Sequence, residues 1–297
     1  MGEALPGGMK TVKDVVALSS AYLDAKGIPT ARLDAELLVG SVLGLDRLQL
    51  YLHHDRPVEA AELDAIRPLL RRRADLEPVG YILGEVGFHR LVLKTDARAL
   101  MPRPETETLV EVALAALPPG GALLDVGTGA GAIAVSVAHE RPDARVTAVD
   151  VSADALALAA ENVARIGVEV ELLASDLAAA VAGRAFDVVA ANLPYVPDGD
   201  PRTEAGVVRH EPHLALWGGP DGLDLIRRLI PEAAALLPPG GLLVLEVSDE
   251  QAGRVRDLLT AGGFADVTFH RDLRGVDRVV AGTRGLTPER PEGAGGV

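Results

Sequence analysis

The spacing of apolar residues divides the chain into two parts. Over residues 10–78, apolar side chains recur every three or four positions, as they do on one face of an α-helix. Gly27, Pro29 and Pro57 interrupt this pattern and separate the helical segments. The pattern therefore predicts a small helical domain over residues 10–78.

A different pattern covers residues 79–104. The segment YILGEVGFHRLVLKT alternates apolar and polar residues like a β-hairpin, with its turn around Gly84 to Gly87. The proline-bounded segment MPRPETE follows it. We expect a β-hairpin connector over residues 79–104.

From residue 105 on, helical segments alternate with short apolar strands. The strands are ALLDVG, RVTAVD, VEVELLA, FDVVAA, LLVLEV, DVTFH and DRVVAG. Such alternation predicts an α/β domain over residues 105–282, a doubly wound Rossmann-like sheet with seven strands. Ligands of such sheets bind beyond the carboxyl ends of the strands. The remaining residues, 283–297, are rich in glycine and proline and are expected to be disordered.

Composition and charge narrow the functional classes. The chain has 297 residues and no cysteine, which excludes disulfides, thiolate metal sites and a cysteine nucleophile. No apolar run approaches the roughly 18 residues of a membrane span, and the first residues lack the apolar core of a signal peptide. A net charge of −14 disfavours stable nucleic-acid binding. We expect a cytoplasmic protein without a membrane partner.

The first two strands end in residues suited to a nucleoside. The segment DVGTGAGAIA follows the first strand, and its glycines allow a ligand to approach the backbone at a helix N-terminus. Asp150 ends the second strand and is placed to accept hydrogen bonds from both ribose hydroxyls. The same residues nearly match the dinucleotide pattern of nicotinamide enzymes, and a glycine turn can also serve helix packing alone. The candidate loop consists of Gly127, Thr128, Gly129, Ala130 and Gly131.

The third strand ends in ASDLA. Asp176 and Leu177 offer a polar and an apolar neighbour for the edge and the face of an adenine. Asp176 suits the N-cap of a helix equally well.

The fourth strand ends in ANLPY, a combination that fits a planar nitrogen. The Asn192 side-chain oxygen and the Leu193 carbonyl can accept hydrogen bonds from an amide or exocyclic amine, and Tyr195 can stack on it. Pro194 stiffens the turn and restricts Leu193 to extended backbone. A nitrogen held in this way before an activated methyl group needs no strong base, because it becomes acidic as it is methylated. The alternative is a helix-capping asparagine followed by a proline turn.

Together these motifs resemble the release-factor glutamine methyltransferases, the PrmC/HemK family, over roughly residues 10–282. The matching segments are MPRPETETLVE, DVGTGAGAIA, VDVSADALALAAENV, FDVVAANLPYVP, EPHLALWGGPDGLDLIRRLI and LRGVDRVV.

The resemblance implies S-adenosylmethionine as methyl donor and no metal. It implies as substrate the glutamine of the GGQ motif in a class I peptide chain release factor, docked with help from the helical domain. Asn192 and Tyr195 are then catalytic, and residues 103–107 close over the cleft. The implied cofactor site comprises Gly127, Thr128, Gly129, Ala130, Gly131, Asp150, Asp176, Leu177 and Asn192, and the implied acceptor site comprises Asn192, Leu193, Pro194 and Tyr195.

Three features depart from the family pattern. Leu193 stands where the family usually has proline, which keeps the carbonyl but makes the turn less rigid. His213 replaces an arginine and Val247–Ser248 replaces an Ile-Gly pair, and these changes bear on substrate choice more than on methyl transfer. Asp221 and Gly222 are expected to shape a turn, and His210 and His213 to lie on surface loops. The chain is expected to be a monomer.

Two other functions stay open. The first is amino methylation of adenine or cytosine in nucleic acid. Such enzymes also use an Asn-x-Pro-Tyr turn to hold a planar nitrogen, but the net charge of −14 disfavours binding to nucleic acid. The second is a non-catalytic nucleotide-binding module, which would have no use for Asn192 or Tyr195.

Overall fold

The computed structural model describes residues 10–285, which form two compact units. The helical unit comprises residues 10–85 together with residues 203–211. The sheet unit comprises residues 86–202 and 212–285. The chain therefore leaves the sheet unit once, for nine residues, and returns to it.

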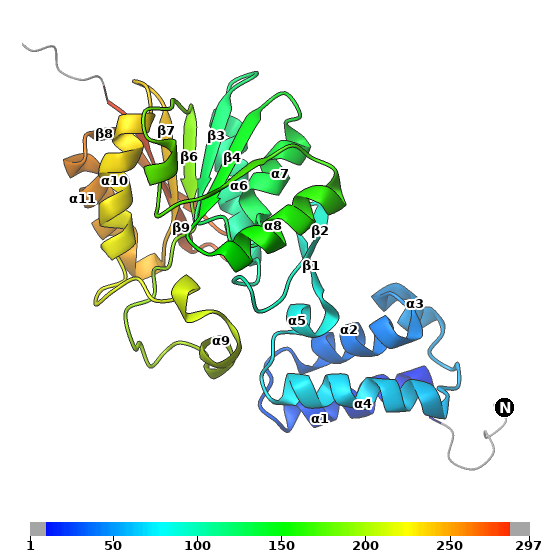
Figure 1. The fold of residues 1–297 in the computed structure, drawn as a ribbon. Helices are drawn as coiled ribbons and strands as arrows, with labels where there is room; N and C mark the ends of the chain where they lie inside the picture. The colour runs from blue at the N-terminus through cyan, green and yellow to red at the C-terminus, as the bar shows by residue number, and fades with distance from the viewer. Residues whose placement is uncertain (1–9, 286–297) are drawn as a thin grey trace, which may run out of the picture. The chain divides into compact units, whose positions relative to one another are not determined.

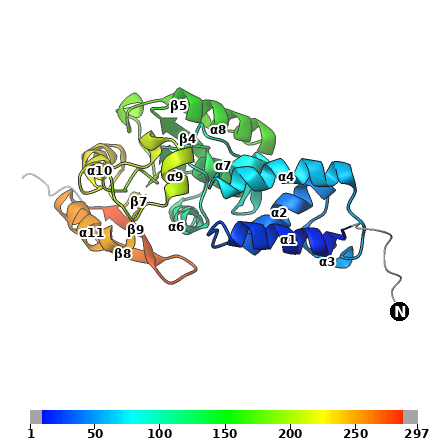
Figure 2. The same ribbon diagram turned by 90° about the horizontal axis from the view of Figure 1, so that it is seen from below.

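The helical unit confirms the helices expected from the apolar spacing. The Val12, Val39 and Ile66 side chains are buried together where α1, α2 and α4 pack, and Figure 2 shows these three helices. Thr11 and Asp46 begin α1 and α3 with capping boxes. The helices of this unit are α1 (Val12–Asp24), α2 (Ala31–Leu43), α3 (Arg47–Leu52), α4 (Ala60–Ala74), α5 (Val79–Leu83) and α9 (Ala205–His210).

Helix α9 joins this unit although it is distant in the sequence. Arg209 Nη1 lies 2.5 Å from Asp75 Oδ1, and His210 Nε2 donates to the Asp75 carbonyl at 2.8 Å. Within α4, Arg73 Nε donates to the buried Asp34 carboxylate at 2.7 Å. The polar residues of the helical unit thus hold its own elements together.

The hairpin lies later in the sequence than expected. Its strands are β1 (Glu85–Phe88) and β2 (Leu91–Lys94), with His89 at φ 48° in the turn. The expected turn around Gly84 to Gly87 was wrong. Gly84 adopts a left-handed conformation and ends α5, a frequent role of glycine after a helix.

The sheet unit contains the seven expected strands in the order β5-β4-β3-β6-β7-β9-β8. The first five are parallel, and β9 is antiparallel to both neighbours. Thr283 and Arg284 belong to β9, so the expectation that disorder begins at residue 283 was wrong for them, and residues 286–297 lie outside the described part. The strands are β3 (Ala122–Val126), β4 (Arg145–Asp150), β5 (Glu171–Ala174), β6 (Val188–Ala191), β7 (Leu242–Glu246), β8 (Phe264–Arg271) and β9 (Asp277–Arg284).

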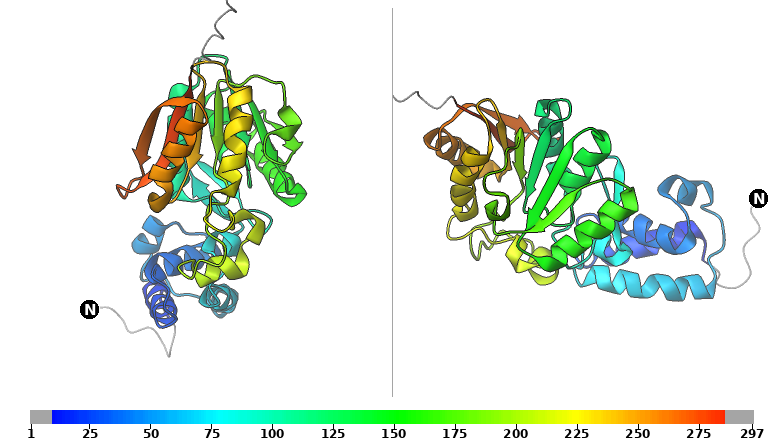
Figure 3. Two further views of the ribbon diagram at one scale, coloured as in Figure 1. Left: turned by 90° about the vertical axis from the view of Figure 1, so that its left-hand side faces the viewer. Right: turned by 45° about the horizontal axis from the view of Figure 1, so that its top comes forward.

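Helices cover both faces of the sheet (Figures 1 and 3). Leu123 and Leu124 of β3 are both fully buried, one in each of two cores on opposite faces. This explains why the strands read as continuous apolar runs. One face packs against α6 (Glu107–Ala116), α7 (Ala132–Glu140) and α8 (Ala153–Ile166), the other against α10 (Asp224–Leu236) and α11 (Ala252–Ala261).

The strand order reverses at β3, because β4 lies on one side of it and β6 on the other. Such a reversal leaves a crevice at the carboxyl ends of the two diverging strands. The glycine loop follows β3 and the Asn192 turn follows β6. The topology therefore brings these two motifs together.

Candidate active site

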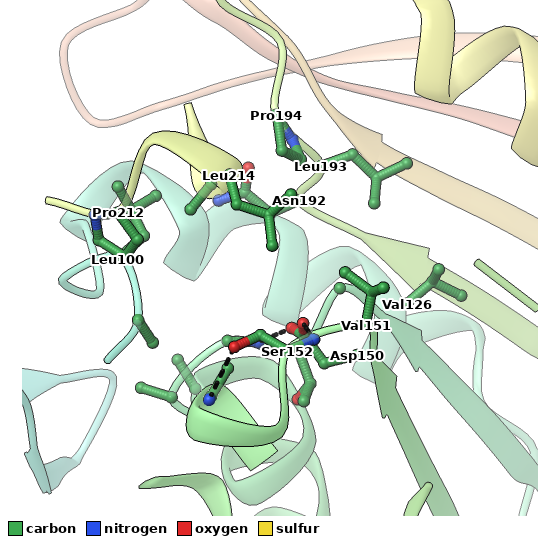
Figure 4. A pocket seen from close by; sticks show the side chains of 18 of the residues that line it. Leu100, Val126, Asp150, Val151, Ser152, Asn192, Leu193, Pro194, Pro212 and Leu214 are labelled. Carbon is green, nitrogen blue, oxygen red and sulfur yellow. Dashed lines mark hydrogen bonds between the residues drawn. The ribbon is translucent and has the colours of Figure 1, made fainter. Parts of the chain in front are cut away.

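A cavity of about 350 Å³ lies at the carboxyl ends of β3, β4 and β6. This volume is within the range of small-molecule sites, about 300–1,000 Å³. Figure 4 shows the Asn192 turn, Pro212 and Leu214 on one side of the cavity and Asp150, Val151 and Ser152 on the other. Gly127 to Ala130 of the expected cofactor loop and Asn192 to Pro194 of the expected acceptor turn share this one cavity, whereas Gly131 is not among the described residues that line it.

The glycine loop needs its glycines for conformation. Gly127, Gly129 and Gly131 have φ values of 73°, 55° and 83°, which side-chain-bearing residues rarely adopt. The backbone N–H groups of Gly127 and Thr128 both donate to the Val149 carbonyl, at 2.9 and 3.0 Å. The loop is thereby tied to the neighbouring strand β4.

Asp125 supports this loop from within the core. Its carboxylate accepts hydrogen bonds from Thr128 Oγ1 at 2.6 Å and from the Ala134 N–H at 3.2 Å. Complete burial raises the pKa of Asp125 to about 7. Asp125 was not among the expected site residues, although a carboxylate inside an apolar strand was the available signal.

The Asp150 carboxylate is held rigidly by the backbone. Gly129 N–H donates to its Oδ2 and Ser152 N–H to its Oδ1, each at 2.9 Å. Each carboxylate oxygen has a further lone pair, so Asp150 can accept two more hydrogen bonds on the cavity side. The Asp150 carboxylate is held in a fixed position and can only accept hydrogen bonds, so it fits a pair of ribose hydroxyls that donate.

Asp176 and Leu177 line the cavity, and their contact with an adenine stays a prediction. Asp176 Oδ2 accepts from Arg228 Nη2 at 2.7 Å, and the short 3-10 helix that follows, Ala179–Val181, has Ala178 and not Asp176 at its N-cap. Ser175 Oγ instead accepts from the Ala180 N–H, at 3.0 Å. The capping alternative for Asp176 is wrong.

Asn192, Leu193 and Pro194 line the cavity. The residues that follow β6 are not helical, so the capping alternative for Asn192 is wrong as well. Asn192 Nδ2 donates to Thr106 Oγ1 at 3.1 Å. The side-chain oxygen of Asn192 therefore keeps its acceptor capacity for a ligand.

Tyr195 differs from its neighbours. It is not among the described residues that line the cavity, and its hydroxyl donates to Glu246 Oε1 at 3.3 Å. Burial is the main cause that raises the pKa of Tyr195. Its stacking on an acceptor amide stays a prediction.

The loop at residues 218–222 braces the acceptor turn. A Cβ on Gly218 would collide with the Pro194 carbonyl, and a Cβ on Gly222 with the Tyr195 carbonyl. The Tyr195 carbonyl accepts from Gln251 Nε2 at 2.8 Å. Gly222 therefore shapes a turn, as expected, and that turn packs against the backbone of the acceptor residues Pro194 and Tyr195.

Asp221 holds the same loop in place. Its carboxylate accepts from the Leu223 N–H at 3.2 Å and from Arg227 Nη2 at 2.6 Å. The expected role of Asp221 in shaping a turn agrees with these contacts.

Residues 103–107 contribute in part. Arg103 and Thr106 line the cavity, whereas Glu105 lies 3.4 Å from Arg274 and Glu107 accepts from the His89 N–H at 2.9 Å. Two of these five residues therefore line the cavity, and the closure of the segment over the cleft stays a prediction.

Residues 10–285 contain neither a membrane-spanning helix nor a cluster of metal ligands. No helix there is long and apolar enough to cross a membrane. No group of three or more histidine, cysteine or acidic residues there could hold a metal ion.

The fold has known relatives. A methyltransferase from Pyrococcus furiosus has a similar structure, with a TM-score of 0.51 and 21% sequence identity, covering 65% of this chain and 89% of that chain. The 16S rRNA N2 G1207 methyltransferase of Thermus thermophilus, solved in complex with AdoMet and guanosine, has a TM-score of 0.50 and 19% identity, covering 67% of this chain and 49% of that chain. With the strand order, these likenesses define the sheet unit as a Rossmann-like methyltransferase fold.

Sequence comparison is more specific. Residues 14–84 match the PrmC N-terminal domain and residues 104–209 the methyltransferase small domain. The release factor glutamine methyltransferase of Geobacter sulfurreducens is 41% identical, covering 93% of this chain and 97% of its own length. That of Chlorobaculum tepidum is 42% identical, covering 90% and 95%. The chain belongs to the release factor glutamine methyltransferase family.

Proposed function

We propose that this protein transfers the methyl group of S-adenosylmethionine to the side-chain amide nitrogen of a glutamine, in the GGQ motif of a class I peptide chain release factor. The observation that carries this proposal is the shared cavity of the glycine loop and the Asn192 turn. Family membership supports the choice of substrate.

The residues of the cavity fit the cofactor. Asp150 would accept from both ribose hydroxyls, Leu177 would contact the adenine face, and the glycine loop would let the cofactor approach the backbone. When bound, S-adenosylmethionine supplies an activated methyl group on a sulfonium. Asp176 would accept from the exocyclic amine of adenine, beside its present partner Arg228.

The acceptor amide is held by Asn192 and Leu193. The Asn192 side-chain oxygen and the Leu193 carbonyl would accept its two N–H hydrogens, which fixes the nitrogen and draws its lone pair out of conjugation. Holding two reactants in this way can lower a barrier by about 7–11 kcal/mol. Tyr195 would stack on the amide after a side-chain movement, or else brace the turn through Glu246.

The helical unit would help to dock the release factor. Its surface exposes several large apolar side chains, which are typical of protein contact surfaces. These are Leu18, Tyr22, Leu33, Leu48, Tyr51 and Leu52. We keep the expectations of a monomer and of a cytoplasmic location as part of this proposal.

Labelled S-adenosylmethionine tests the proposal directly. The protein is incubated with the labelled donor and either purified class I release factors or ribosomal and genomic nucleic acid. Label in the GGQ peptide is expected. Label in nucleic acid alone would instead establish base methylation, and an absence of cofactor binding by calorimetry would exclude both enzymes.

A further inference from the structure

A chain of hydrogen bonds runs from Asn192 into the core of the sheet unit. Asn192 Nδ2 donates to Thr106 Oγ1 at 3.1 Å, and the Thr106 hydroxyl is hydrogen-bonded to the Glu246 carboxylate. Glu246 ends strand β7 and is 2% exposed. The function proposed above gives no role to Thr106 and only a bracing contact to Glu246.

The direction of this chain follows from counting protons. A carboxylate only accepts hydrogen bonds, and a hydroxyl has one proton to give. Ionised Glu246 therefore accepts a hydrogen bond from the Thr106 hydroxyl, and Thr106 Oγ1 in turn accepts from Asn192 Nδ2. Only the Nδ2 end of the Asn192 amide can donate, so the Oδ1 end is left for a ligand.

We propose that Glu246, acting through Thr106, is a positioning residue that determines which end of the Asn192 amide faces the methyl acceptor. This inference rests on the proposed function, in which Asn192 accepts an N–H of a planar amide. If the Asn192 amide were reversed, its Nδ2 would face the N–H of the substrate amide. Two donors cannot form a hydrogen bond, so the nitrogen that receives the methyl group would not be held.

The surroundings of Glu246 allow its charge to change. Its Oε2 atom has no hydrogen-bond partner among the described residues, and burial raises its pKa to about 7. Arg278 on β9 and the hydrogen bonds from Thr106 and Tyr195 favour the charged form, while Glu105 opposes it. A protonated Glu246 can donate to Thr106, which releases the hydroxyl proton to turn toward Asn192.

Substitutions at Thr106 separate orientation from packing. Thr106→Val keeps the shape and removes the hydroxyl, and it is expected to lower kcat by about 10- to 100-fold, the usual cost of losing an orienting partner, with little change in cofactor affinity. Thr106→Ser keeps the hydroxyl and is expected to retain kcat within about threefold of wild type. Equal kcat values for the two variants would overturn the proposal.

The pH profile tests Glu246 itself. The required form is the ionised one, so wild-type kcat is expected to rise with pH, with its midpoint near pH 7, and to level off above that range. Glu246→Gln cannot ionise and is expected to lack this step. A step of equal size in both proteins would contradict the assignment.

An NMR measurement separates this inference from the proposed function. The sequence has only two asparagines, Asn162 and Asn192, and two glutamines, so ¹⁵N side-chain amide signals are few. The Asn192 signals are expected to shift with a midpoint near pH 7, and to stop doing so in Glu246→Gln. Asn162 is the matched control, because its Nδ2 donates to the Ala130 and Lys94 carbonyls.

The possible results are distinct. A titrating Asn192 signal in a protein that methylates no release factor would reject the function and keep the orientation mechanism. Asn192 signals that stay constant from about pH 6 to 8.5 would reject the mechanism, whatever the substrate.

Discussion

The side chain of Leu193 lies against the backbone of Gly127, so that a Cβ on Gly127 would be 2.9 Å from Leu193 Cδ2. The cofactor loop and the acceptor turn are therefore in direct contact. Leu193 is also the residue that replaces the proline usual in the family. The buried side chain of Leu193 contacts the cofactor loop. A proline at this position would instead make the acceptor turn more rigid.

Gly127→Ala is expected to weaken cofactor binding by at least about tenfold. The φ of 73° costs a side-chain-bearing residue roughly 1–2 kcal/mol, and the added methyl group must displace Leu193 as well. Calorimetric titration with S-adenosylmethionine measures the effect.

Gly120→Ala is the matched control for this substitution. Gly120 has a similar φ of 66°, but no atom lies within 4 Å of an added Cβ. It should lose roughly 1–2 kcal/mol of stability and keep its cofactor affinity. Equal affinities in the two alanine variants would show that the contact with Leu193 does not matter.

Asp150→Ala is expected to lower cofactor affinity by about 10- to 100-fold. It removes the charged acceptor for two hydroxyl groups, and hydrogen bonds to charged groups contribute about 1.5–3 kcal/mol. Asp154→Ala, which removes an exposed carboxylate from the first turn of α8, controls for net charge and should change the dissociation constant less than about twofold. An unchanged dissociation constant for Asp150→Ala would remove it from the site.

Asp125 should make the protein less stable as the pH rises. Its folded-state pKa of about 7 lies above the ordinary value of 3.8, so the folded state binds the proton more tightly than the unfolded state. The free energy of unfolding is therefore expected to fall between about pH 4 and pH 7, with no further fall from this group above that range.

Urea denaturation at pH 5 and pH 8 measures this fall. Asp125→Asn keeps the acceptor oxygen without the charge and should show a smaller difference between the two pH values than wild type. Asp154→Asn, at the surface, should behave like wild type. The same difference in wild type and Asp125→Asn would mean that Asp125 titrates normally.

The strands and the main site residues were predictable for a local reason. Buried parallel strands read as short apolar runs, and the residues with unusual chemistry, such as Asp150 and Asn192, follow directly where those runs end. Because parallel strands end at one edge of the sheet, separate sequence motifs could be placed in a single cavity.

The features that were missed depend on partners far away in the sequence. Gly218 gains its role only because the fold places it beside Pro194, and the contact of Thr106 with Asn192 could not be assigned within the expected segment 103–107 for the same reason. Glu246 follows the apolar run of β7, yet its partners Thr106 and Tyr195 come from other elements. Helix α9 joins the helical unit through Asp75, a contact that apolar spacing does not encode.

The role of Asn192 is tested most directly by single-turnover methylation of a release factor by the preformed complex of enzyme and S-adenosylmethionine. We predict that Asn192→Ala slows this step by at least about 100-fold while cofactor affinity changes little, since it removes one oriented hydrogen bond at the reacting nitrogen. A variant that methylates the GGQ glutamine at nearly the wild-type rate would contradict the account.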